Sequence, residues 1–134
     1  MQRPNKKITD LRRLRRLYED GAVFTAFDTE TSGISPSNSR IIEIGAVRFT
    51  KDGVLGKWTH LFFPDQILSP FIISLTHITQ EMVDAADPIS MHIRDFLSFL
   101  DSSIIVAHNA QFDLNFLPVC SYPVMGRVAC RIQF

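Results

Sequence analysis

Two carboxylates, Asp28 and Glu30, lie two positions apart in the segment FDTETSG (27–33). Side chains two apart on a β-strand point to the same face, about 6–7 Å apart along it. Carboxylates are costly to bury, and like charges this close raise a pKa unless a cation neutralises them. Hard oxygen ligands in this arrangement suit Mg²⁺ or Mn²⁺, which complete their shells with water and phosphate oxygens.

A third acid, Asp113, follows in the segment AHNAQFD (107–113). It falls in the first turns of a predicted helix that comes directly after a predicted strand over 103–108. If that strand adjoins the strand carrying Asp28, Asp113 lies over the same end of the sheet, where ligands of open α/β sheets bind. Three converging acids predict two-metal phosphoryl-transfer chemistry, in which metals activate water and stabilise the leaving oxygen.

Each of these residues also has a purely structural interpretation. A DxE pair at a strand end is common, and surface carboxylates are usually just solvated. Asp113 could simply interact with a helix dipole. Glu43, within IIEIGAV (41–47), is interpreted as a charge-paired structural residue. His108 either orients the site or merely ends a strand, and the residues alone leave both open.

The elements that must position these acids follow from hydrophobic periodicity. Helices are predicted over 8–21, 79–86, 90–100 and 110–117. Strands are predicted over 22–30, 40–50, 55–63 and 103–108. Thr79 and Ser90 are the expected N-caps of their helices, and Asp52-Gly53 predicts a hairpin turn. This order indicates an α/β layer with a mixed sheet, in which strand 103–108 pairs parallel to strand 22–30 after a right-handed crossover.

Composition limits the class of protein. A chain of 134 residues, 46% of them hydrophobic, is sufficient for one domain with a core. No apolar run is long enough to predict a membrane span, and no apolar segment follows the charged N-terminus as in a secretory signal. Cys120 and Cys130 form neither a disulfide framework nor a CxxC pair, so a reducing, cytoplasmic setting is expected.

The charge of the chain is zero in sum but uneven in distribution. Residues 1–16 carry seven basic side chains against one acid, Asp10, which gives this stretch a charge of +6. We therefore expect a basic N-terminal helix over 1–21 and an acidic body over 22–134. The basic helix points to a polyanionic partner, although a solvated helix face explains the same charges.

Four segments together resemble the DnaQ-like (DEDD) 3′→5′ exonucleases, the group of the proofreading epsilon subunit of DNA polymerase III. They are FDTETSG, RIIEIGAVRF, LTHIT and VAHNAQFDLNFL, spread over about residues 22–117. The resemblance implies an RNase H-like fold and two divalent metal ions, Mg²⁺ or Mn²⁺. It implies that Asp28, Glu30 and Asp113 are catalytic metal ligands.

The same resemblance implies how substrate would bind. Thr31 falls where the backbone of the family meets the 3′-terminal nucleotide, and Ile34 falls where an apolar side chain wedges against the terminal base. Asn109 and Phe112 fall at positions around the substrate strand. The implied function is a 3′→5′ exonuclease that hydrolyses single-stranded 3′ ends of nucleic acid in proofreading or repair. DNA is the favoured substrate, and the sequence leaves the choice between DNA and RNA open. A DNA polymerase is the implied partner.

One feature of the family has no counterpart here. Its third motif supplies a histidine as general base and a last aspartate for metal, whereas the last such residues of this chain are His108 and Asp113. The segment GRVACRIQF (126–134) resembles the start of the family's fifth strand. The sequence is therefore expected to be a truncated exonuclease domain with an incomplete C-terminal part and little activity of its own.

Two alternatives stay open at this point. The first is a catalytically inactive remnant of the fold that binds nucleic acid or a polymerase, which the missing third motif favours. The second is a transposase- or resolvase-like metal nuclease of the same general fold. That second alternative would need a late acid, which this sequence also lacks.

Overall fold

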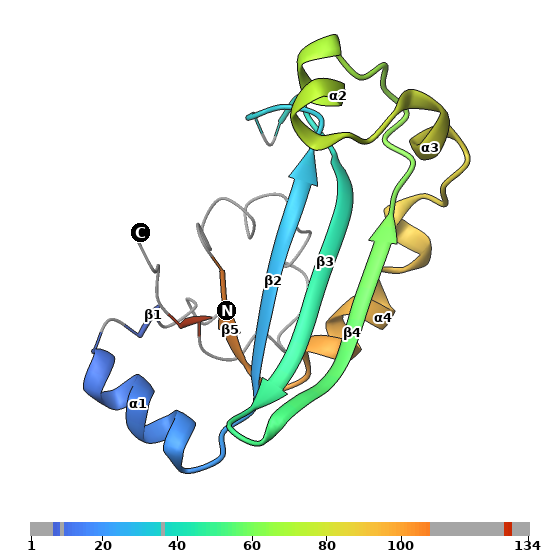
Figure 1. The fold of residues 1–134 in the computed structure, drawn as a ribbon. Helices are drawn as coiled ribbons and strands as arrows, with labels where there is room; N and C mark the ends of the chain where they lie inside the picture. The colour runs from blue at the N-terminus through green and yellow to red at the C-terminus, as the bar shows by residue number, and fades with distance from the viewer. Residues whose placement is uncertain (1–6, 9, 36, 108–127, 130–134) are drawn as a thin grey trace.

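The computed structural model describes residues 7–8, 10–35, 37–107 and 128–129 (Figure 1). In these residues, one sheet has the strand order β1-β6-β5-β2-β3-β4. Its strands are β1 (Lys7–Ile8), β2 (Phe24–Thr31), β3 (Ile41–Thr50), β4 (Gly53–Leu61), β5 (Ile104–Val106) and β6 (Val128–Ala129). The helices are α1 (Leu11–Glu19), α2 (Pro70–Thr76), α3 (Gln80–Asp84), the 3₁₀ turn η1 (Ile89–Met91) and α4 (Ile93–Leu100).

The centre of the sheet is mixed, as predicted. β2 runs antiparallel to β3, which continues through the Asp52-Gly53 turn into β4. Gly53 has a φ of 133°, a conformation that side chains with a Cβ rarely adopt. β5 pairs parallel to β2, with Phe24 opposite Ile104, so the predicted parallel pair is confirmed. An α/β class with a mixed sheet and flanking helices is therefore confirmed as well.

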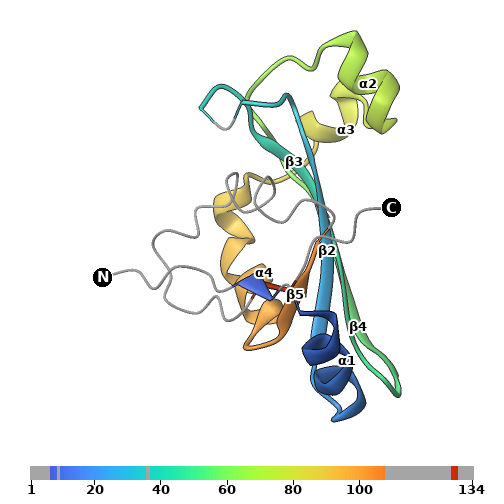
Figure 2. The ribbon, with the colours of Figure 1, turned by 90° about the vertical axis from the view of Figure 1, so that its left-hand side faces the viewer.

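The two faces of the sheet are covered by different helices. On one face, α4 packs through Ile93, Phe96 and Leu100 against a core that includes Phe27 of β2. Figure 2 shows α4 lying to one side of the strands. Phe24, three positions before Phe27, points to the opposite face and contacts α1 through Leu14 and Leu17.

The starts of two helices differ from the prediction. α1 begins at Leu11 because Asp10 caps it, accepting bonds from the Arg12 and Arg13 N–H groups. The predicted cap at Ser90 is wrong, because Ser90 lies within the 3₁₀ turn η1 and α4 starts at Ile93 after His92. Thr79 is confirmed as the N-cap of α3, accepting a bond from the Met82 N–H.

α2 is a helix that the sequence analysis did not assign. Ser69 caps it by accepting a bond from the Ile72 N–H at 3.2 Å, and Pro70 occupies the first helical turn. Proline suits that position because its missing N–H has no partner there in any helix. The Ser-Pro pair was therefore a usable signal, but the β-branched residues after it favour a strand. Packing of Ile72 with Ile42 and Val83 supports the helix.

A prediction about stability follows from the end of α2. The backbone of His77 is in the left-handed conformation, with a φ of 61°, which brings its Cβ into an unfavourable contact. The side chain is exposed, so its burial does not offset this strain. We expect His77→Gly to raise the free energy of unfolding by about 0.5–1 kcal/mol, measured by urea denaturation. His77→Ala keeps the Cβ and should give no such gain. A glycine variant that is less stable than the parent chain would contradict this account.

Candidate active site

The paired carboxylates lie where the sequence places them, towards the carboxyl end of β2. Asp28 is exposed and Glu30 is partly exposed, whereas Phe27, Thr29 and Thr31 between and beside them are buried. This alternation puts Asp28 and Glu30 on one face of the sheet, the face away from α4. The N–H of Thr29 donates to Asp28 Oδ1 at 3.0 Å, which orients that carboxylate.

The neighbouring strand places a third acid beside this pair. Glu43 of β3 lies directly opposite Glu30, and Gly45 lies opposite Asp28. Directly opposed residues point to the same face, so Asp28, Glu30 and Glu43 make that face acidic. Among the described residues, a Cβ added to Gly45 would meet nothing within 4 Å, so none of them fills the space beside Asp28.

The described residues do not support the interpretation of Glu43 as a charge-paired residue. Their ion pairs are Arg15 with Glu19, Arg48 with Asp101, and His92 with Asp87. In this part of the chain Glu43 therefore adds to the negative charge near Glu30. The register of β2 against β3 produces this arrangement, and the sequence pattern alone did not reveal it.

The turn that follows β2 is tightly built. Thr31 Oγ1 donates to the Gly33 carbonyl at 2.6 Å, and the Ser32 N–H donates to the Arg40 carbonyl at 2.8 Å. A Cβ on Gly33 would meet the Ser39 hydroxyl, so a larger residue there would force that hydroxyl to move. This constraint was not recognised in the sequence, although the Ser-Gly pair directly after the acids was the signal.

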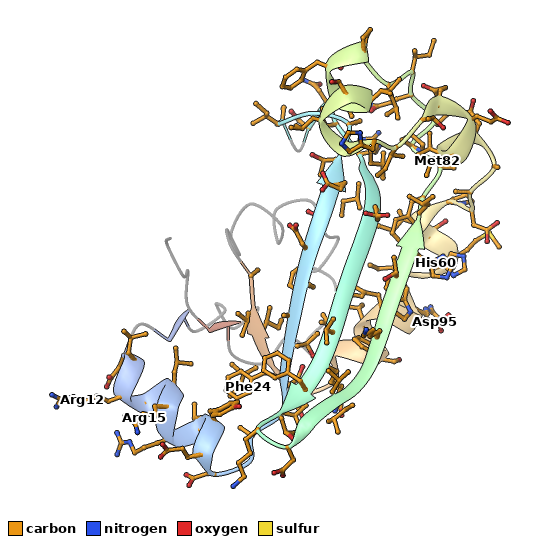
Figure 3. The ribbon with its side chains drawn as sticks, viewed as in Figure 1. Arg12, Arg15, Phe24, His60, Met82 and Asp95 are labelled. Atoms are coloured by element: carbon orange, nitrogen blue, oxygen red, sulfur yellow. The ribbon has the colours of Figure 1, made fainter. Side chains whose placement is uncertain are left out.

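Ile34 follows this turn and is 84% exposed. An isolated exposed isoleucine is ordinary on a protein surface, but this one comes four positions after Glu30. Figure 3 shows that the turn after β2 lies at the same end of the sheet as α2 and α3. The exposed apolar side chain is thus available to a ligand bound at that end.

The other predicted site residues, Asn109, Phe112 and Asp113, lie outside the described residues, as do His108 and the predicted helix 110–117. The path of β5 bears on them. Val106 pairs with Ala26, two positions before Asp28, and the two strands are parallel. β5 therefore runs towards the end of the sheet where Asp28 and Glu30 lie.

The donor set can be compared with what a divalent cation requires. Asp28 and Glu30 offer carboxylate oxygens on one open face, the donors that Mg²⁺ and Mn²⁺ prefer. Among the described residues, no group of three His, Cys, Asp or Glu side chains is placed to hold a metal ion. The donors present fit a hard cation, and a complete ligand set requires further groups.

Comparisons with known proteins identify the family of this chain. A family model described as exonuclease matches residues 25–128. The chain belongs to this exonuclease family. The epsilon subunit of DNA polymerase III from Treponema pallidum (strain Nichols) is 43% identical over 94 residues, which cover 70% of this chain and 44% of that protein. A PolC-type DNA polymerase III from Thermotoga petrophila is 40% identical over 107 residues, covering 80% of this chain and 8% of that protein.

Solved structures show the same relationship. Exonuclease X in complex with 5′ overhanging duplex DNA has a TM-score of 0.58 and 32% identity, covering 71% of this chain and 54% of that one. A product-bound exonuclease I has a TM-score of 0.68 at 19% identity, covering 82% of this chain and 30% of that one, and it shares the fold. The RNase H-like fold expected of this chain is that of these exonucleases. The chain spans less than half the length of the epsilon subunit it matches.

Proposed function

We propose that this chain is a 3′→5′ exonuclease domain that hydrolyses phosphodiester bonds at single-stranded 3′ ends, in DNA rather than RNA. The observation that carries the proposal is the pairing of Asp28 with Glu30 on one open face at the carboxyl end of β2. Membership of the exonuclease family supports it. Proofreading or repair is the proposed role. A DNA polymerase is the proposed partner, because one relative is named as a subunit of DNA polymerase III and another as a PolC-type DNA polymerase III.

Asp28, Glu30 and Asp113 are the residues proposed to hold divalent metal ions, two Mg²⁺ or Mn²⁺. When bound, such ions activate water and stabilise the leaving oxygen of the phosphodiester. Glu30 and Asp28 contribute negative charge to a face that stays open beside Gly45. This charge would repel the phosphate backbone if no cation were bound, so metal and substrate binding should be coupled.

The substrate strand is proposed to be held by groups flanking these acids. The Thr31 backbone would meet the terminal nucleotide, and the tight turn built by Gly33 would fix its position. The exposed side chain of Ile34 would pack against the terminal base. Asn109 and Phe112 are proposed to lie along the strand. A cytoplasmic location is proposed with the replication role, and none of the described helices is long and apolar enough to cross a membrane.

A test of this function uses the purified chain and a 5′-labelled single-stranded DNA oligonucleotide with Mn²⁺ or Mg²⁺. Slow shortening from the 3′ end in single-nucleotide steps is the expected result, because this chain lacks the third motif, and chelation of the metal should stop it. The same oligonucleotide made of RNA tests the preference for DNA. Cleavage inside the strand, or cleavage that survives chelation, would contradict the proposed reaction.

The basic N-terminal helix gives a separate prediction. We propose a division into this helix, residues 1–21, and an exonuclease body, residues 22–134. Figure 3 shows Arg12 and Arg15 on α1. Arg15 forms an ion pair with Glu19 at 2.9 Å, whereas Arg12 and Arg16 are both exposed. Each phosphate of a single strand that a basic side chain contacts adds about 0.7 to the slope of log affinity against log salt concentration. If Arg12 and Arg16 each contact one phosphate, replacing both by glutamine should reduce this slope by about 1.4.

The salt dependence is measured from binding of a labelled single-stranded oligonucleotide at several salt concentrations. Arg94→Gln provides the matched control, because Arg94 is also exposed but lies on α4, across the sheet from α1. This control should leave the slope unchanged. If the double variant of α1 also keeps the parent slope, the basic helix only packs on the sheet or improves solubility.

A further inference from the structure

β4 forms one border of the sheet, and its outer side has no strand beside it among the described residues (Figure 1). The N–H of Phe62 donates to the Ile42 carbonyl at 2.9 Å, so the backbone of Phe62 faces β3. Backbone groups alternate along an antiparallel strand. Lys57, Thr59 and Leu61 therefore direct their N–H and carbonyl groups outward, where a further strand could pair with them.

The stretch of β4 whose backbone groups point outward ends near Phe63, where the segment 85–87 lies beside the chain. The N–H of Phe63 donates to the Asp87 carbonyl at 2.9 Å, so the segment 85–87 lies beside the chain just beyond β4. A groove of about 470 Å³ is formed there. Its walls are partly apolar, from Met82 and Ala85, and partly acidic, from Glu43 and Asp87. Asp87 Oδ2 accepts a hydrogen bond from His92 Nε2 at 2.9 Å, and this holds that carboxylate in place.

The opposite end of β4 carries complementary groups. Lys57 is exposed, and Leu55 and Val54 are each 59% exposed. One end of the edge thus presents a cation beside exposed apolar side chains. The other end presents carboxylates beside an apolar wall. Thr59 lies midway between Lys57 and Leu61, so the edge is complementary to a copy of itself turned about Thr59.

We propose that two copies of this chain pair through β4 as antiparallel strands, related by a two-fold axis at Thr59. Lys57 of each copy then lies opposite Leu61 of the other, and Leu61 is the cross-strand neighbour of Glu43. The long lysine side chain can extend over Leu61 to the Glu43 carboxylate. Leu55 of each copy reaches the apolar wall of the groove in the other copy.

This arrangement accounts for features that a solvated edge leaves unexplained. Lysine on an edge strand commonly prevents unwanted strand addition. Here Lys57 would disfavour most other registers of strand pairing. In the proposed register it instead lies near the acidic groove of the other copy. A two-fold pairing is also closed, because each copy offers the same edge, β4, to the other. The result is a dimer with one continuous sheet.

The first experiment measures the mass of the purified chain by sedimentation over a wide range of protein concentration. A concentration-dependent dimer is the expected result for the parent chain. Thr59→Pro removes two interchain hydrogen bonds, because the Thr59 residues face each other, and should weaken the dimer at least about tenfold. Proline is tolerated on an edge strand where the N–H faces outward, so the fold should survive.

Thr59→Val is the matched control, since it keeps the outward N–H and should still dimerise. Circular dichroism checks that all variants are folded. A parent chain that stays monomeric at every concentration would overturn the proposal. So would a Thr59→Pro variant that is folded and dimerises as well as Thr59→Val.

A second experiment tests the charge pairing. Lys57→Glu alone and Glu43→Lys alone should each weaken the dimer, because like charges then face each other twice. An equal mixture of the two variants should form a heterodimer, because both pairs are again of opposite sign. Failure of the mixture to associate, with both variants folded, would exclude this register and with it the proposed pairing.

Discussion

Asp28→Asn is expected to reduce 3′-exonuclease activity by about 10³-fold, because it removes one of the charges proposed to hold the metal ions, which supply several kcal/mol of transition-state stabilisation. The substitution should leave the fold intact. Asp28 is exposed, and the asparagine carbonyl can still accept the bond that Thr29 N–H donates to Asp28 Oδ1. The loss should therefore appear in activity and in Mn²⁺ binding, without a change in the urea midpoint.

The control for this variant is Asp52→Asn. Asp52 is also an exposed aspartate, but it lies in the turn between β3 and β4, at the far end of β3 from Glu43. Asparagine before glycine suits such a turn, so this variant should be as active and as stable as the parent chain. Activity near the parent level in Asp28→Asn would remove Asp28 from the metal site. A loss of activity in both variants would indicate a general effect of charge.

The position of Asp28 and Glu30 shows what local pattern can establish. A period of two fixes which residues share a face, whatever the strand pairs with. The hydrophobic alternation of FTAFDTET was enough to place both acids on the less buried face of β2. The parallel pairing of β5 followed from chain order, because a helical segment separates it from the hairpin of β3 and β4.

Glu43 shows what local pattern cannot establish. Its position opposite Glu30 depends on the register of β3 against β2, and a shift by one residue would turn its side chain to the other face. Register is decided by packing across the whole sheet. The start of α4 is a similar case, since Ser90 has the propensity of a cap but η1 occupies that position. The roles of Asp113, Asn109 and Phe112 stay predictions.

The second large effect is expected at the centre of the core, where Phe96→Ala should lower the free energy of unfolding by about 3–5 kcal/mol. Phe96 of α4 is fully buried, with its ring centroid 5.7 Å from that of Phe27 and 5.1 Å from that of Trp58. Alanine would leave a cavity between the helix and the sheet face opposite Asp28. A domain of this size typically has about 5–15 kcal/mol of stability, so the variant should be marginal.

Urea denaturation followed by tryptophan fluorescence measures this loss, because Trp58 contacts the ring that is removed. Phe71→Ala is the matched control, since it makes the same chemical change at a side chain that is 71% exposed on α2. Its effect should stay within about 0.5 kcal/mol, as for most surface substitutions. Equal losses in the two variants would show that α4 does not pack on the sheet through Phe96. The sheet face opposite Asp28 and Glu30 would then be covered through contacts other than those of Phe96.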